Sequence, residues 1–427
     1  MLDIGPIHRR EYEIDSGRLA TETRQGKALA RPTAGESKGK QARTGGIKRS
    51  SVEKQADKVA ETVVIAQAPG RIHFLGEHGD PFAGLFLSAA IDRWIKVAVS
   101  PRKDNSLRFY AVDLSERKRT TLINLKFKRE DRWANYIKSA INIFTMMGPV
   151  KGMNFTVVGN IPQQVGLASS SAIEVAAAVA MRGLLNVKMS DKELVRRLLA
   201  SHRSFFEEIP NPADYIVALM ARNDQFLVVD ETDLSVTRIK SPFSRCKFIL
   251  MDSRVPRFGV TSELANRRDD LKTGLEMLSQ GREGANFREF AAMDLLNSMG
   301  DLPEEIRRRS LHVVQEIRRV LDAGDCLERA DLTGFSRLIF QSHESLRNLY
   351  EVSCPEIDWM VKRAQETAGV LGARMTGLGF GGCTYTIIKN EAVGNYRERI
   401  DDYERIFSFH PGIYEVKLAT GSRIVPN

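Results

Sequence analysis

Residues 162–172, with the sequence PQQVGLASSSA, constrain the fold of this chain more than any other stretch. They lie between a predicted strand at 154–158 and an Ala-rich predicted helix at 171–185. A loop that enters a helix presents unpaired backbone N–H groups and the positive end of the helix dipole, which suits phosphate. Gly166 allows close approach, and the serines offer hydroxyls to phosphate oxygens or Mg²⁺. An N-capped buried helix has the same composition, so this segment alone leaves both interpretations open.

A second segment with candidate functional side chains, APGRIHFLGEHGD, occupies residues 68–80 and follows a predicted strand. It holds Arg71, Glu77, His78 and Asp80 within a short stretch. Carboxylates and a histidine on one loop suit hydrogen bonds to several sugar hydroxyls. The same residues also suit a metal cluster or a solvated turn.

The third segment, TGLGFGGCT at residues 376–384, lies between two strand-like stretches. Gly377, Gly379, Gly381 and Gly382 bring the backbone close to another group. That group is a ligand, a neighbouring loop, or the other arm of a tight hairpin.

The first segment, residues 162–172, is not a Walker loop, because GxxxxGK followed by Ser or Thr is absent.

The 427 residues predict two domains, which we place at 61–243 and 244–427. Residues 1–58 contain 13 Lys and Arg against 8 Asp and Glu, so we expect residues 1–60 to form a disordered basic tail. No aromatic residues interleave the charges between about Arg18 and Ser51, so we expect no nucleic-acid partner. Four widely spaced cysteines without a CxxC pair, and no apolar run of membrane-spanning length, indicate a cytoplasmic protein with no membrane partner.

Hydrophobic periodicity predicts an α+β protein of two lobes, because strands are followed by helices in each half. We expect the first strand to end at Pro69 and Gly70. The predicted strands lie at 62–67, 85–100, 106–113, 154–158, 226–229 and 247–252, with a strand–loop–strand at 370–388. The predicted helices lie at 132–147, 171–185, 262–280, 304–322, 331–349, 355–367 and 392–406, with one more beginning at Ser190.

Taken together, the three segments resemble, in order and spacing, the three motifs of the GHMP small-molecule kinases, and within them the galactokinases. The resemblance extends over residues 62–427 and includes WANY at 133–136, SHESLR at 342–347 and YEVSCPE at 350–356. It implies a two-lobed α+β fold, each lobe a mixed or antiparallel sheet packed with helices, and an active site in the cleft between the lobes. The tail is not part of the resemblance.

The resemblance also implies roles for particular residues. Asp214 takes the place of the catalytic aspartate, and Arg71 assists it. Ser170 takes the place of the Mg²⁺-binding serine. The implied sugar-binding residues are Glu77, His78, Gly79, Asp80 and Leu264. The implied ATP-binding residues are Gln164, Val165, Gly166, Leu167, Ala168, Ser169, Ser170, Trp133, Gly379 and Gly381.

Several positions depart from the family pattern. Gln164 and Val165 stand where the family has a glycine and a small residue, so their side chains must point away from the phosphates or narrow the loop. His202 stands where the family has a second Mg²⁺ ligand, a glutamate, and histidine suits that hard cation poorly. Either Glu207 or Glu208 takes its place, or the metal rests on Ser170, water and the phosphates. Leu264 replaces a tyrosine that packs on the sugar. These changes put nucleotide geometry, metal affinity and sugar selectivity in question.

The resemblance implies an enzyme that uses ATP and Mg²⁺ to phosphorylate galactose at its anomeric hydroxyl, as a monomer or weak oligomer. Two alternatives stay open at this point. Leu264 and the altered residues before Asp214 leave room for a kinase of another sugar, such as galacturonate, arabinose or N-acetylgalactosamine. Gln164 and His202 leave room for a non-catalytic sugar and ATP sensor on the same scaffold.

Overall fold

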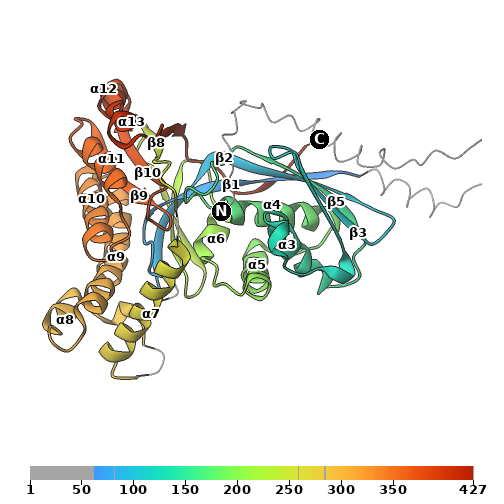
Figure 1. Cartoon of the computed structure of the whole chain (residues 1–427), viewed down its shortest axis with the longest axis horizontal. Coiled ribbons are helices and arrows are strands. Elements are labelled where there is room, and N and C mark those ends of the chain that lie inside the picture. The colour runs from blue at the N-terminus through green and yellow to red at the C-terminus, as the bar shows by residue number, and fades with distance from the viewer. Residues whose placement is uncertain (1–61, 81, 258, 283–284, 427) are drawn as a thin grey trace, which may run out of the picture.

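The computed structural model describes residues 62–426 apart from 81, 258 and 283–284. The expected basic tail at 1–60 therefore lies outside the described residues. Figure 1 shows an elongated molecule in which the long strands β1 (Val64–Leu75) and β2 (Leu85–Pro101) run between a helix-rich end and an end built around β3 and β5. Within the described residues, no helix is long and apolar enough to cross a membrane.

The first sheet is built on β1 and β2. Its strand order is β12-β1-β2-β5-β3-β4, and β6 pairs with β2 and β7. All pairings are antiparallel except that of β3 with β5, so the sheet is mixed. The other strands are β3 (Ser106–Ala111), β4 (Glu116–Thr121), β5 (Met153–Gly159), β6 (Gln225–Asp230), β7 (Ser235–Lys240) and β12 (Arg423–Val425).

The end predicted for the first strand is wrong. Strand β1 continues through Pro69 and Gly70 to Leu75, and its pairing with β2 shifts register between those two residues. An irregularity of this kind accommodates a proline, which has no N–H to donate to the ladder. The longer strand carries Arg71 and His73 into the centre of the molecule.

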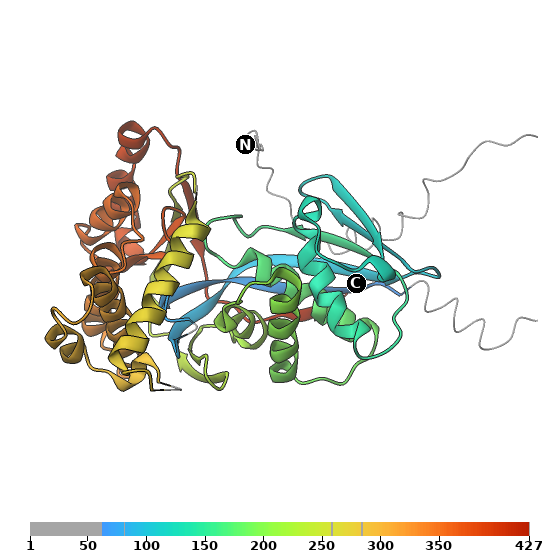
Figure 2. The same ribbon diagram turned by 60° about the horizontal axis from the view of Figure 1, so that its bottom comes forward.

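Helices pack on this sheet through small side chains. Helix α4 (Ser169–Leu184) lies against β1 and β2, and its buried face is largely alanine, which allows close approach to the strands. Figure 2 shows α3, α5 and α6 grouped beside it. The Ser190 side chain accepts the Glu193 N–H, which confirms the predicted helix start. These helices are α3 (Ala134–Thr145), α5 (Asp191–Phe206) and α6 (Pro212–Met220).

The second sheet has the order β11-β8-β10-β9 and is antiparallel throughout. Helices α10 and α11 lie against its strands, and α9 packs on α7 and α10. The strands are β8 (Cys246–Asp252), β9 (Val370–Thr376), β10 (Cys383–Lys389) and β11 (Gly412–Val416). The helices are α7 (Val260–Leu278), α8 (Ala292–Asn297), α9 (Glu304–Glu328), α10 (Leu332–Asn348), α11 (Pro355–Gln365), α12 (Val393–Ile400) and α13 (Asp402–Phe407). The short 3-10 turns are η1 (Leu122–Asn124), η2 (Arg129–Asp131), η3 (Phe287–Glu289) and η4 (Asn390–Ala392).

The two sheets share one hydrophobic core. Phe74 of β1 contacts Phe226 of the first sheet with ring centroids 4.9 Å apart, and Tyr385 of the second sheet at 4.8 Å. The chain also returns to its starting sheet, since β12 pairs with β1. Continuous packing across the junction holds the residues of both halves in a fixed relation.

Candidate active site

Asp214 lies in the first turn of α6, where the backbone prepares a place for a carboxylate. The Asn211 side chain accepts the Ala213 N–H at 2.8 Å, and Pro212 occupies the start of the helix. The helix dipole favours a negative charge at this end. Asp214 is therefore presented on a rigid element close to β1.

Two side chains of β1 converge on Asp214. Arg71 Nε donates to Asp214 Oδ1 at 2.6 Å, and His73 Nε2 lies 3.0 Å from the same oxygen. His73 Nδ1 lies 2.6 Å from the Ser88 hydroxyl, so a neutral imidazole that donates to Asp214 accepts from Ser88. His73 did not figure in the sequence prediction. The alternation of side chains along a strand could have identified it, because residues two apart, such as Arg71 and His73, point to the same face.

The charge state of Asp214 follows from these contacts. Burial alone would raise the pKa of its carboxyl, but the Arg71 charge and the His73 hydrogen bond outweigh burial and hold that pKa below its usual value. Burial lowers the pKa of His73, with the Arg71 charge adding to the effect. Asp214 is thus an anion, and His73 is a neutral donor beside it.

The loop at 162–170, called here the serine loop, follows β5 and leads into α4. Gln164 is exposed and has a φ of 61°, a backbone conformation that glycine adopts more easily. Val165 is only 6% exposed and packs in the core. The Val165 side chain therefore points into the core and does not narrow the loop, while the effect of Gln164 on the phosphates stays a prediction.

Arg71 connects the serine loop to Asp214. Its Nη1 donates to the Gly166 carbonyl at 2.5 Å, and its backbone N–H donates to the Leu167 carbonyl at 3.2 Å. Ser171 at the start of α4 donates to Asp214 Oδ2 at 3.4 Å. One guanidinium thus fixes the distance between the serine loop and the candidate base.

The glycine loop, residues 377–382, touches the serine loop through Gly377. A Cβ on Gly377, whose φ is +86°, would lie 2.6 Å from the Gly166 Cα. Cys383 N–H also donates to the Val165 carbonyl at 3.2 Å. Gly379 instead packs on Val352, and Gly381 on Val255. The predicted contact of these two glycines with ATP stays a prediction, and Gly377 is the glycine that supports the serine loop.

We expect Gly377→Ala to raise the KM for ATP at least tenfold, because the new methyl group must displace the serine loop. The KM for the sugar should change less. Gly281→Ala is the matched control, since Gly281 has a similar φ of +74° and open space around it. Steady-state kinetics with each substrate varied in turn checks this. Equal effects of the two substitutions on the KM for ATP would contradict it.

The acidic loop, residues 76–80, begins with a carboxylate that the protein itself holds. Glu77 Oε1 accepts the Gly377 N–H and, at 3.1 Å, the Thr376 hydroxyl, while Oε2 contacts the Arg374 guanidinium. Both oxygens of Glu77 thus have protein donors. Its direct contact with a sugar stays a prediction, and the structure gives it a second task of joining the acidic loop to the glycine loop.

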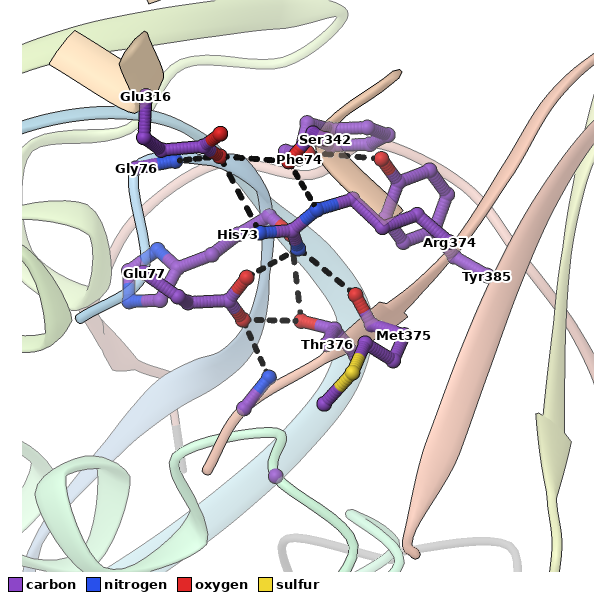
Figure 3. Close-up of polar contacts among 12 residues, drawn as sticks. His73, Phe74, Gly76, Glu77, Glu316, Ser342, Arg374, Met375, Thr376 and Tyr385 are labelled. Atoms are coloured by element: carbon purple, nitrogen blue, oxygen red, sulfur yellow. Dashed lines mark hydrogen bonds and ion pairs between the residues drawn. The ribbon is translucent and has the colours of Figure 1, made fainter. Parts of the chain in front are cut away.

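Arg374 lies at the centre of a buried ionic network (Figure 3). Its side chain is fully buried and reaches between Glu77 and Glu316, whose Oε1 lies 3.3 Å from Arg374 Nη2. Glu316 Oε1 also accepts the Gly76 N–H at 2.9 Å and the Ser342 hydroxyl at 2.7 Å. Buried charges persist only when paired in this way. The network therefore ties the acidic loop to α9, α10 and β9.

His78 and Asp80 complete the acidic loop. The His78 ring stacks on Tyr350 with centroids 4.5 Å apart, and its buried Nε2 has no hydrogen-bond partner within the described part of the chain. Burial holds the pKa of His78 well below its usual value, so the ring is neutral and offers one free nitrogen. Asp80 lies 3.6 Å from Arg268, and burial raises its pKa. An unsatisfied buried nitrogen at this place fits a hydroxyl-bearing ligand.

Three other predicted residues take less direct positions. Gly79 packs against Gly84, and Leu264 is buried in the core at 7% exposure. Trp133 precedes α3, and its Nε1 donates to Glu116 at 2.6 Å. The contacts proposed for these residues with sugar or adenine stay predictions.

The oxygen atoms near the start of α4 fit a hard cation, whereas His202 does not. His202 Nδ1 lies 3.0 Å from Glu174 Oε2 and 2.9 Å from the Tyr215 hydroxyl, so it is already engaged. Glu174 is four residues beyond Ser170 on the same helix face, and its Oε1 has no partner among the described residues. Ser170 and Glu174 are the oxygen donors that suit Mg²⁺ here.

Comparison with known proteins first defines the class. The family model for the GHMP kinases N terminal domain matches residues 135–222, and that for the GHMP kinases C terminal matches 325–401. The mevalonate kinase of Methanococcus jannaschii has the same fold, with a TM-score of 0.59 and 18% identity over 84% of this chain and 99% of that one. The protein is a GHMP kinase, with the two-lobed α+β fold expected from the sequence.

The family within this class follows from closer relatives. The galactokinase galactose-binding signature matches residues 53–101. The chain is 34% identical to the Roseiflexus sp. galactokinase over 78% of this chain and 85% of that protein. It is 31% identical to the Streptococcus thermophilus galactokinase over 84% and 94%. The structure of Lactococcus lactis galactokinase complexed with galactose has a TM-score of 0.81 at 24% identity, covering 88% of this chain and 99% of that one. The chain belongs to the galactokinase family.

Proposed function

We infer that this chain phosphorylates galactose at its anomeric hydroxyl with ATP, giving galactose 1-phosphate and ADP. The position of Arg71 supports this inference most strongly. Its guanidinium donates both to Asp214 and to the Gly166 carbonyl of the serine loop, so a proton acceptor lies beside a phosphate-binding loop.

The reaction requires a sugar hydroxyl between Asp214 and the γ-phosphate. The anomeric oxygen attacks the γ-phosphorus, the bond from that phosphorus to the β–γ bridging oxygen breaks, and ADP leaves with the electron pair. Asp214 takes the hydroxyl proton. Because its pKa is lowered, Asp214 is a weak base, so most of the acceleration comes from positioning and charge neutralisation. Arg71 and His73 orient the carboxylate for that transfer.

The Ser170 hydroxyl and Glu174 would hold Mg²⁺ here, together with phosphate oxygens and water. When bound, the ion would neutralise charge on the transferred phosphoryl group. Glu174 is kept in place by Tyr215, whose hydroxyl donates to its Oε2 at 2.6 Å.

An ADP-release assay with Mg²⁺-ATP and a panel of sugars tests the substrate. We expect turnover with galactose, and kcat/KM values at least tenfold lower with arabinose, N-acetylgalactosamine and galacturonate. Galacturonate should be poorest, because its carboxylate would add a negative charge to a site that already holds the buried carboxyls of Glu77 and Asp80. Faster turnover of another sugar would assign the enzyme to that sugar instead.

A further inference from the structure

A pocket of about 500 Å³ opens beside the acidic loop. Sites for small molecules commonly have volumes of roughly 300–1,000 Å³. Pro212 is one of its wall residues, so the pocket lies next to the start of α6, two residues before Asp214. The negative charge of Asp214 also contributes to raising the pKa of Asp80. Its walls include Asp80, Phe82, Leu199, Pro212, Glu231 and Thr232.

Glu231 reaches this pocket because of strand register. Leu85 at the start of β2 pairs with Asp230 at the end of β6. Because the strands are antiparallel, this register places Gly84, just before β2, beside Glu231, just after β6. The Glu231 backbone N–H donates to the Gly84 carbonyl at 3.4 Å, and its Oε1 accepts the Gly84 N–H. The Gly84 bond engages Oε1 and leaves Oε2 as the second oxygen of this carboxyl. That oxygen belongs to a residue that lines the pocket.

We propose that Glu231 is a further sugar-contacting residue, whose carboxyl hydrogen-bonds one hydroxyl of the bound galactose beside Asp80. The proposal rests on the galactokinase activity inferred above. It assigns to the pocket a second carboxyl that comes from β6 rather than from the acidic loop.

The protonation of Glu231 decides what it offers to the sugar. Burial and the nearby Asp80 charge raise its pKa to about 8, while the Gly84 N–H and Arg288 oppose the shift and Asp230 adds to it. At pH 7 the carboxyl is therefore mostly neutral, so Oε2 can carry a proton and donate it to a sugar oxygen. Above pH 8 the group ionises beside Asp80 and loses that donor.

Calorimetric titration of the four monodeoxygalactoses, lacking the 2-, 3-, 4- or 6-hydroxyl, tests the contact. In the wild type, the analogue that lacks the contacted hydroxyl should bind about five- to tenfold more weakly than galactose through this hydrogen bond. In Glu231→Ala that one loss should vanish, while the losses at the other positions remain. Four unchanged losses in Glu231→Ala would overturn the proposal.

Two further variants separate contact from architecture. Glu231→Gln keeps a neutral acceptor and donor, so it should retain the wild-type pattern at pH 7. In the wild type we expect the dissociation constant of galactose to rise roughly fivefold between pH 7 and 9.5. In Glu231→Gln this rise should be absent, because the amide does not ionise. The same rise in Glu231→Gln would count against the proposal, even if Glu231→Ala does not fold.

Arg288→Met is the matched architectural control. Arg288 holds the chain next to Gly84 and Glu231, because it donates to the Ala83 carbonyl at 2.5 Å and to the Asp230 carboxylate at 2.7 Å. Arg288→Met should weaken the binding of galactose and of the four deoxy analogues by the same factor. If this variant instead abolished the contribution of one hydroxyl alone, the assignment to Glu231 would be overturned. Galactose that binds without ADP release would remove the proposed kinase function and leave the Glu231 contact standing. A wild type that does not bind galactose would remove both.

Discussion

Replacing Asp214 by Asn lowers kcat for galactose phosphorylation by about 100- to 10,000-fold, the usual contribution of a positioned base together with loss of its charge. The amide keeps the shape of the carboxylate but cannot take the hydroxyl proton. Binding of ATP should change less than threefold, because the amide oxygen of Asn can still accept from Arg71, which holds the Gly166 carbonyl, and the backbone hydrogen bonds of the serine loop do not involve Asp214.

Kinetics and nucleotide titration on the same preparation check this prediction. Asp401→Asn is the control, since Asp401 is an exposed aspartate far along the chain. Normal turnover by Asp214→Asn would show that another group accepts the proton. A loss of ATP affinity equal to the loss of kcat would show that Asp214 mainly organises the nucleotide site.

Replacing Arg374 by Met destabilises the fold by about 3–5 kcal/mol, because it leaves Glu77 and Glu316 buried without their shared cation. Burial would raise the pKa of Glu316, but Arg319 and Arg374 outweigh it and hold that pKa below its usual value. Below this lowered pKa the ion pairs are lost. The stability that they contribute is therefore present at neutral pH and falls only as pH drops through the acid range.

Thermal unfolding at pH 7 measures this effect, with an expected drop in the midpoint of about 5–10 °C. Arg318→Met is the matched control, because Arg318 lies on α9 near Glu316 but is 74% exposed and forms an ion pair with Asp322 at the surface. Adding Glu316→Gln to Arg374→Met should recover part of the loss by removing one orphaned charge. Equal midpoints for Arg374→Met and Arg318→Met would contradict the role assigned to the network.

Local patterns predicted much of this protein. The strand, loop and helix around Gly166 carry their own signals, since glycine, serine and alanine set the loop and the helix by chemistry that acts within a few residues. Asp214 and Arg71 were also identified in advance, and the structure brings them together. The fold class followed from the order of strands and helices and from the resemblance to the GHMP kinases.

Contacts between distant residues could not be predicted in the same way. Glu77 and Arg374 are 297 positions apart, and only packing of the two sheets brings them together. Glu231 reaches its pocket through the register of β6 against β2, which the sequence does not specify. The register shift at Pro69 and Gly70 likewise depends on the partner strand, so β1 was predicted too short.

The most direct test of the central claim is a ³¹P NMR measurement on the purified chain with Mg²⁺-ATP and galactose. The account predicts a sugar 1-phosphate resonance that grows in equal amount with ADP, and its absence with Asp214→Asn. A protein that is stabilised thermally by galactose but forms no sugar phosphate would be a sensor on a kinase scaffold and would contradict the account.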